Sequence, residues 1–349
     1  MRTIKIDPAI EDIIAGALEG EEVTRANAIR LLSDVAVNSF EMAMLCGAAD
    51  QLSRARTGNL GEVFSQIGIN IGHCTKECDF CVLRAERPES LMSRDHVVER
   101  ALAFVEQGAN TVGLMVTADY AFEEFLEVGR AVRAAIPDGF PIVGNVGDFD
   151  EGQAEELVSA GYTAVYHVIR LREGIDTRIE PWERKRTLAA ARAAGLDVSY
   201  CVEPIGPEHG PEELVDAMLA GKEFEPTSMA TMRRVAVHGT PLASRGQISE
   251  VEQARVQAVM SLLTASWNNL MMLSAHEPAK QLLRSGAHRV TAEGGVNPRD
   301  TEEETSSGRG FSVAECRAML VDAGWELREG PSPAMLGPLR GRQGSTALA

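Results

Sequence analysis

The segment VFSQIGINI at 63–71 alternates between apolar and small or polar residues, a pattern typical of a β-strand. A helical pattern follows, RDHVVERALAFVEQG at 94–108, and then a second strand-like stretch, TVGLMV at 111–116. This order of strand, loop and helix recurs along the chain. Further strands are predicted at 141–146, 164–170, 197–203, 232–237, 270–275 and 288–293.

The number of these repeats predicts the fold class. Eight strands, each followed by a helix-sized segment, are what a closed (β/α)8 TIM barrel requires. An open doubly wound sheet is built from the same units and remains the alternative. We expect a helical extension with three helices at 1–60, a single barrel domain at 61–325, and an irregular C-terminal tail at 326–349, either flexible or folded over a barrel rim.

The amino-acid composition argues against nucleic-acid and membrane partners. The chain has 349 residues, 44% of them hydrophobic, and 34 Lys plus Arg against 51 Asp plus Glu give a net charge of −17. Because no Lys/Arg-rich run accompanies this acidity, we expect no nucleic-acid partner. The sequence shows no signal-peptide pattern and no apolar run long enough to span a membrane, so we expect a cytoplasmic protein without membrane contact. In that reducing compartment, cysteines serve metal binding or catalysis rather than disulfides.

Three cysteines lie close together just after the first strand. The sequence GHCTKECDFC at 72–81 holds Cys74, Cys78 and Cys81. Thiolates suit zinc or iron–sulfur clusters. A structural zinc needs four ligands, and the fourth candidate here, His73, is crowded against Cys74. Three thiolates on a [4Fe–4S] cluster would instead leave one iron open for chemistry, at the strand end where such barrels carry active sites.

The spacing Cys-x3-Cys-x2-Cys, with Phe80 before the last cysteine, resembles the signature of radical S-adenosylmethionine (SAM) enzymes. The resemblance implies a [4Fe–4S] cluster on Cys74, Cys78 and Cys81, with SAM bound at the open iron. It further implies reductive cleavage of SAM to methionine and a 5′-deoxyadenosyl radical, which abstracts hydrogen from a substrate. The electron would come from a reduced donor of the flavodoxin or ferredoxin type.

Similarity extends over roughly 40–325 and points to the biotin synthase group, which includes methylornithine synthase and the maturase of iron–iron hydrogenase. All are (β/α)8 barrels, so the resemblance favours the closed barrel over the open sheet. The segments that carry it are AADQLSRARTGN, EGQAEELVSAGY, ERKRTLAAARAAGLDVSYCVEPIG, MRRVAVHGTPLA and LSAHEPAKQLLRSGAHRV.

The resemblance also implies contacts with SAM. Phe80 matches the aromatic that packs near the adenine, and Arg184 matches the arginine near the SAM carboxylate; a hydrophobic loop anchor and a helix-surface arginine are the ordinary alternatives. Relatives often hold the methionine amine with a Gly-Gly-Glu-like turn after strand two, where this chain offers Thr117 and Asp119 instead. At the end of strand four, Arg170 replaces an acidic residue and is interpreted as meeting an anionic substrate.

Biotin synthase carries a second, [2Fe–2S] cluster inside its barrel, held by cysteines and an arginine. No suitable ligands occur at the matching strand positions of this chain, so we predict that it does not make biotin by that route. The residues at those positions are Leu114 or Met115, Ile142, Ser199 and Met272.

The remaining cysteines have several possible roles. Cys201 shares the inward face of its strand with Ser199, so it could bind a cluster or sulfide, donate hydrogen to a radical, or simply fill space. Cys46 and Cys316 lie on predicted amphipathic helices, where they either fill the core or join Cys201 in an auxiliary cluster.

Charged residues near strand ends suggest the substrate. Arg170, Glu203 and Arg234 are predicted to grip a small zwitterion or carboxylate, beside Cys201 as a further catalytic candidate. The leading hypothesis is a radical SAM enzyme acting on a small metabolite or cofactor precursor by rearrangement or cofactor assembly. Two alternatives remain: sulfur insertion with an auxiliary cluster involving Cys201, and a non-catalytic zinc-binding scaffold.

Overall fold

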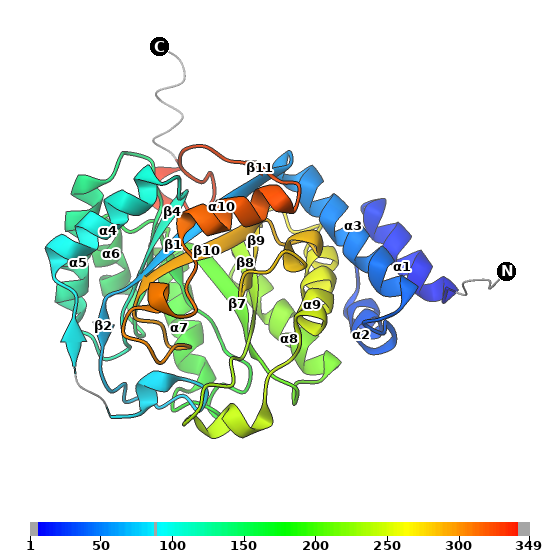
Figure 1. The fold of residues 1–349 in the computed structure, drawn as a ribbon, viewed down its shortest axis with the longest axis horizontal. Coiled ribbons are helices and arrows are strands. Elements are labelled where there is room, and N and C mark those ends of the chain that lie inside the picture. The colour runs from blue at the N-terminus through cyan, green and yellow to red at the C-terminus, as the bar shows by residue number, and fades with distance from the viewer. Residues whose placement is uncertain (1–5, 87–88, 341–349) are drawn as a thin grey trace, which may run out of the picture.

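The computed structural model describes residues 6–86 and 89–340, and its centre is a barrel of eight parallel strands (Figure 1). In barrel order the strands are β1 (Leu60–Gly68), β4 (Thr111–Met115), β5 (Ile142–Asn145), β6 (Ala164–Tyr166), β7 (Asp197–Ile205), β8 (Ser228–Arg233), β9 (Met272–His276) and β10 (Arg289–Gly295). β10 pairs with β1 from Glu62 beside Arg289 to Gly68 beside Gly295. This seam closes the sheet, so the predicted (β/α)8 barrel is confirmed and the open sheet is excluded.

Helices surround the barrel and bury the outward faces of its strands. They are α4 (Arg94–Glu106), α5 (Phe122–Ala135), α6 (Glu151–Ser159), α7 (Pro181–Ala193), α8 (Pro211–Lys222), α9 (Glu250–Leu263) and α10 (Val313–Asp322). Because strand side chains alternate, Leu114 and Ile142 point into this outer layer and pack with Phe125 of α5. Their neighbours Met115 and Val143 therefore point inward. Between β9 and β10 the chain forms only one short helix, Leu282–Arg284, in place of a long one.

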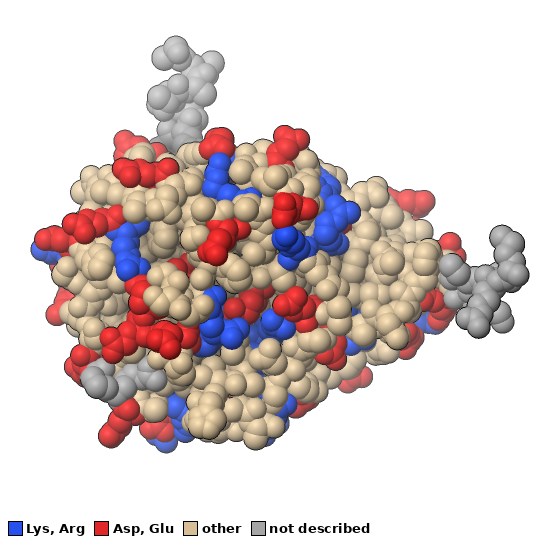
Figure 2. Space-filling model, viewed as in Figure 1, with Lys and Arg blue, Asp and Glu red and all other residues tan. Residues whose placement is uncertain are grey.

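The N-terminal helices lie beside the barrel. They are α1 (Pro8–Leu18), α2 (Arg25–Asp34) and α3 (Phe40–Thr57), and each begins at a side chain that accepts a backbone N–H: Asp7, Thr24 and Ser39. α2 packs on α8 and α9, and α3 packs on α9 (Figure 1). Among the described residues, no helix is both long and apolar enough to cross a membrane. Figure 2 shows Asp and Glu spread over the visible face, with Lys and Arg dispersed among them.

The chain after α10 covers the end of the barrel where the strands begin. β11 (Glu326–Leu327) pairs in parallel with the start of β1, and the following residues are irregular. Ala334 and Met335 are buried against Phe64 and Met272 inside the barrel. This segment therefore fills the closed end of the barrel, opposite the strand ends at which an active site is expected. Residues 341–349 of the predicted tail lie outside the described residues.

The largest differences from the predicted strand bounds are at β6 and β8. β6 ends at Tyr166, so the predicted end of this strand, 167–170, leaves the sheet. β8 begins and ends four residues before the predicted 232–237. The apolar residues Val235 and Val237, which suggested a strand, are buried instead against the loop that follows β1. Burial outside the sheet gives the same apolar pattern as burial within it.

We expect Gly68→Ala to destabilise the protein by about 1–3 kcal/mol, the usual range for overpacking. Gly68 ends β1, and a Cβ there would overlap the backbone of Val296, which cannot move without opening the β1–β10 seam. Gly47→Ala in α3 is the matched control, because a Cβ there meets no atom within 4 Å. This exposed helical position should gain about 0.5–1 kcal/mol. Urea unfolding of both variants measures the difference, and equal stabilities would contradict it.

Candidate active site

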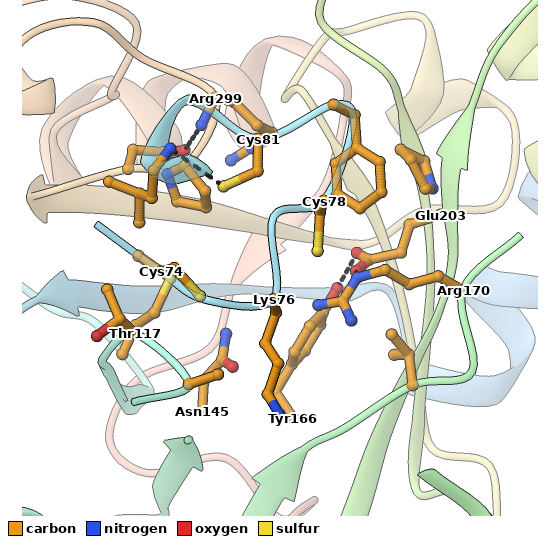
Figure 3. Close-up of a pocket in the computed structure, with 18 of the residues that line it drawn as sticks. Cys74, Lys76, Cys78, Cys81, Thr117, Asn145, Tyr166, Arg170, Glu203 and Arg299 are labelled. Atoms are coloured by element: carbon orange, nitrogen blue, oxygen red, sulfur yellow. Dashed lines mark hydrogen bonds and ion pairs between the residues drawn. The ribbon is translucent and has the colours of Figure 1, made fainter. Parts of the chain in front are cut away.

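The strand ends open into one cavity with a volume of about 1300 Å³, its open mouth included. Every barrel strand, or the loop that directly follows it, contributes side chains to the lining. The loop that carries the three cysteines also borders the cavity (Figure 3). This is the end at which barrels of this class carry their active sites.

The cysteine loop is held in shape by its own backbone. The Cys74 N–H donates to the Leu83 carbonyl at 2.8 Å, and the Cys81 N–H donates to the Cys78 carbonyl at 3.0 Å. The loop after β6 supports it from outside, because the Asp79 N–H donates to a carbonyl of that loop. Cys74, Cys78 and Cys81 all line the cavity. The structure therefore brings the three predicted metal ligands to one site.

Burial favours the neutral form of these thiols. It raises the pKa of Cys78, and it raises the pKa of Cys81 to about 12. A bound metal cluster would have to displace these protons, as metal binding to thiols generally does. Within 6–86 and 89–340, no three His, Cys, Asp or Glu side chains converge where one ion could bind them.

Two residues predicted to contact SAM are placed differently from each other. The Thr117 side chain lines the cavity, where Asn70 binds its hydroxyl at 2.9 Å and its backbone N–H at 2.9 Å. Asp119 does not line the cavity. It accepts from the N–H of Thr75 at 2.6 Å and from the Thr75 hydroxyl at 2.7 Å, and so fixes the cysteine loop. Asp119 thus positions the cysteine loop, and its assignment to cofactor binding stays a prediction.

Arg184 lies buried in the cavity wall, in a network with Asp148 and His167. Arg184 Nη1 is 3.1 Å from one oxygen of Asp148, and His167 Nε2 is 3.0 Å from the other. Burial alone would raise the pKa of Asp148, but these contacts outweigh it and hold that pKa well below the ordinary value. Burial lowers the pKa of His167 to about 4, so the ring is neutral at neutral pH. Arg184 is therefore a fixed, buried cation.

Glu173 connects Arg184 to Arg170 and was not predicted from the sequence. Its carboxylate accepts from the Arg170 N–H at 2.9 Å and from the Thr177 hydroxyl at 2.7 Å. Glu173 Oε2 also lies 3.8 Å from Arg170 Nη1 and 3.5 Å from Arg184 Nε. The guanidinium carbon of Arg170 is 6.0 Å from the centre of the Phe80 ring, which also lines the cavity. Glu173 thus holds two cations against the cysteine loop.

Tyr166 and Glu203 form the polar part of the inner wall, on β6 and β7. The Tyr166 hydroxyl donates to Glu203 Oε2, and Arg170 Nε lies 3.2 Å from Glu203 Oε1. Cys201, one inward position earlier on β7, is fully buried behind them and does not line the cavity. Burial raises its pKa well above the ordinary value. The predicted trio of Arg170, Cys201 and Glu203 is therefore contiguous, with the thiol set back from the open space.

Arg299 completes the opposite wall and was also missed in the sequence. Its guanidinium binds Glu277 at 2.7 Å and Glu293 at 2.8 Å, and Arg309 binds Glu277 at 3.2 Å. Glu277 follows β9 and Glu293 lies on the neighbouring strand β10. Because two buried carboxylates need an opposite charge, their positions in the sequence indicated a cation between them. Which arginine supplies it depends on the path of the loop after β10.

Arg234 borders the cavity, but its guanidinium is already paired with a carboxylate of the protein. Its guanidinium forms two bonds with Glu208 and donates to the Gly246 carbonyl at 2.8 Å. The side chain is 1% exposed. Arg234 therefore holds the loops after β7 and β8 together, and its assignment to substrate binding stays a prediction.

The Arg234–Glu208 pair makes stability depend on acid pH. Burial would raise the pKa of Glu208, but the hydrogen bond from Arg234 lowers it to about 2, against an ordinary value of about 4.3. The pair's contribution to stability is therefore complete above pH ~4.3 and is lost as the pH falls toward 2. We expect the difference in unfolding free energy between wild type and Glu208→Gln to shrink between pH 5 and pH 3, measured by urea unfolding. A constant difference would contradict this assignment.

The cysteines outside the loop do not form a group. Cys46 on α3 contacts the hydroxyl of Ser285 at 3.3 Å, and Cys316 is fully buried on α10. Cys201 faces the barrel interior, whereas those two helices lie outside it (Figure 1). The structure therefore does not bring the three together for an auxiliary cluster.

The cavity has the donors that a cluster-bound SAM would need. Nε and Nη1 of Arg170 and Nε of Arg184 are buried and ion-paired with Glu203 or Glu173 at 3.2–3.8 Å, without hydrogen-bond geometry among the described residues. These N–H groups suit a carboxylate, and the three thiols suit an iron–sulfur cluster. The residues present therefore fit both groups.

No protein-family model matches the chain. It is 26% identical over 281 residues to the biotin synthase of Picosynechococcus sp., covering 73% of this chain and 75% of that protein. It is 28% identical over 332 residues to the biotin synthase of Renibacterium salmoninarum, covering 89% of this chain and 91% of the relative.

Solved structures show the same fold at lower identity. A crystal structure of methylornithine synthase superposes with a TM-score of 0.75 at 19% identity, covering 91% of this chain and 97% of that one. HydG, a maturase of the [FeFe]-hydrogenase, superposes with a TM-score of 0.74 at 15% identity, covering 93% of this chain and 76% of that one. The likeness to these two structures extends over the barrel and its surrounding helices.

Proposed function

We propose, from the curated biotin synthases that the chain resembles, that it is a radical SAM enzyme of the group that includes biotin synthase, methylornithine synthase and the hydrogenase maturase, and that it acts on a small metabolite or cofactor precursor inside the barrel. Enzymes of this group use a [4Fe–4S] cluster and SAM. One observation carries the proposal: three thiols and two buried arginines line the same cavity.

Each wall of the cavity has a role in this proposal. Cys74, Cys78 and Cys81 hold the cluster, and Arg170 and Arg184 bind the SAM carboxylate. Phe80 packs on the adenine and Thr117 offers its hydroxyl to SAM. When bound, cluster and SAM supply reductive cleavage of a carbon–sulfur bond and a 5′-deoxyadenosyl radical that takes hydrogen from the substrate. An external one-electron donor of the flavodoxin or ferredoxin type supplies the electron.

The substrate that suits this cavity is a small zwitterion or carboxylate. Glu203 on one side and Arg299 on the other are each held by partners of opposite charge. The ammonium of a zwitterion would pair with Glu203, and its carboxylate would pair with Arg299. Because the two substrate charges cancel, binding adds no net charge to the buried site. Arg299 thus takes the role that the sequence assigned to Arg234.

Stimulation of SAM cleavage tests this substrate class. We would incubate the reconstituted protein with SAM, dithionite and each proteinogenic amino acid, and measure 5′-deoxyadenosine against the rate without amino acid. The matched controls are amines that lack the carboxylate. The proposal expects faster cleavage with at least one amino acid and none with its amine. Equal stimulation by the amine would contradict a carboxylate-binding site.

Metal content separates this reaction from the two alternatives. The proposal requires one [4Fe–4S] cluster per chain, and iron and sulfide analysis after anaerobic reconstitution measures it. Clearly more iron would favour sulfur insertion with an auxiliary cluster near Cys201. One zinc per chain, no iron and no SAM cleavage would favour a scaffold without catalysis.

A further inference from the structure

Three side chains at the inner wall form a group that the proposed abstraction step does not use. Tyr166, Cys201 and Glu203 are contributed by the neighbouring strands β6 and β7. The Tyr166 hydroxyl donates to Glu203. Cys201 lies on the same face of β7, between Ser199, which pairs with Tyr166 across the sheet, and Glu203. We call these three residues the tyrosine–cysteine group. It lies in the barrel interior rather than in the outer layer against the helices.

Two members of the group, Tyr166 and Glu203, face the cavity, and Cys201 lies behind them. The Tyr166 side chain lines the same cavity as the cluster cysteines, and Figure 3 shows it beside Glu203 and Arg170. Cys201 is 0% exposed, so no substrate reaches it directly. Tyr166 therefore lies between the thiol and the space in which a substrate radical would form.

The chemistry of these side chains matters in a cavity built for radicals. A phenol O–H and a thiol S–H are weaker bonds than the aliphatic C–H bonds of cavity residues such as Met115 and Val146. Burial raises the pKa of Tyr166 and that of Cys201 well above their ordinary values, so both retain their hydrogens at neutral pH. Both groups therefore hold a hydrogen atom that a carbon radical could take.

We propose that Tyr166 donates a hydrogen atom to the substrate-derived radical and that Cys201 restores Tyr166. This inference rests on the proposed radical function and adds the step that ends the radical. Glu203 acts as a positioning residue that orients the phenol, and Arg170 holds Glu203 at 3.2 Å.

The hydrogen transfer from Tyr166 and its restoration by Cys201 conserve atoms and electrons. The phenol turns about its C–O bond, its O–H bond breaks homolytically, and a C–H bond forms on the substrate. The phenoxyl radical then takes the hydrogen of the Cys201 S–H bond and leaves a thiyl radical. One electron from the low-potential one-electron donor and one proton from water restore the thiol. Each turnover therefore uses two donor electrons, one to cleave SAM and one to restore Cys201.

Isotope transfer from solvent tests the role of Tyr166 without a known substrate. In D2O the exchangeable hydrogens of Tyr166 and Cys201 become deuterium, and SAM is cleaved with dithionite in the absence of substrate. We expect 5′-deoxyadenosine that carries deuterium from wild type, and loss of most of that deuterium in Tyr166→Phe. Tyr200→Phe is the matched control, because Tyr200 lies on β7 and does not line the cavity; it should match wild type.

The outcomes separate the two proposals. If no 5′-deoxyadenosine forms, either without substrate or with any of the amino acids added, the proposed function fails. If it forms without deuterium, or with equal deuterium in Tyr166→Phe, only the inference is overturned. Wild-type protein with ring-deuterated tyrosine gives a second readout that does not depend on the folding of a variant. In freeze-quenched samples its electron paramagnetic resonance should show a radical whose couplings collapse on ring deuteration, and a spectrum unchanged by ring deuteration would overturn the role of Tyr166.

The same spectra test the role of Cys201. Cys201→Ala removes the hydrogen that restores Tyr166, so the tyrosyl signal should become larger and longer-lived than in wild type. Cys316→Ala, which removes another fully buried thiol, should leave it unchanged. A tyrosyl signal equal in Cys201→Ala and wild type would overturn the relay.

Discussion

Cys78→Ala is expected to lose the cluster and, with it, SAM cleavage. The cysteine supplies one of three thiols at the cavity, and the backbone bond from the Cys81 N–H to its carbonyl does not require the side chain. The variant should therefore fold and keep its loop but bind little iron. The loss of activity should exceed the roughly 10–100-fold cost of removing an outer-shell contact of a metal site.

Iron analysis and 5′-deoxyadenosine formation measure this effect. Cys46→Ala is the matched control, since Cys46 lies on α3 against Ser285 and away from the cavity. It should bind iron like wild type. Full iron content in Cys78→Ala would contradict the assignment of the loop as the cluster site.

Glu173→Ala is expected to have the largest effect on stability. The side chain of Glu173 is 1% exposed and lies between Arg170 and Arg184. Its removal leaves two buried cations with less opposing charge. Breaking a buried ion pair in this way costs about 3–5 kcal/mol. The freed guanidinium groups should also move apart, which weakens binding of SAM.

Urea unfolding and SAM binding at equilibrium check this prediction. Glu155→Gln is the matched control because Glu155 is exposed on α6. Surface changes of this kind usually stay within about 0.5 kcal/mol. An unfolding midpoint for Glu173→Ala equal to that of wild type would show that the two arginines do not need this carboxylate.

The barrel and the cysteine loop could be predicted because their signals are local. Strand and helix periods repeat within short windows, and Cys74, Cys78 and Cys81 are fixed relative to one another by eight residues of chain. The bounds of β8 were misplaced because Val235 and Val237 are buried by the cysteine loop, which is distant in sequence.

The charge pairs could not be predicted because they join distant segments. Arg234 and Arg299 both follow barrel strands. Which of them holds two loops together and which of them borders the substrate space depends on the folded positions of their carboxylate partners, Glu208, Glu277 and Glu293. Glu173 lies in an irregular loop whose path the sequence pattern does not define. Such pairings depend on the folded backbone rather than on composition or period.

Formation of 5′-deoxyadenosine tests the central claim most directly. The protein would be reconstituted anaerobically with iron and sulfide, mixed with SAM and dithionite, and analysed by chromatography beside Cys78→Ala. Wild type should yield 5′-deoxyadenosine and methionine, and the variant should yield neither. A complete [4Fe–4S] cluster that binds SAM but yields no 5′-deoxyadenosine, with any amino acid present, would contradict it.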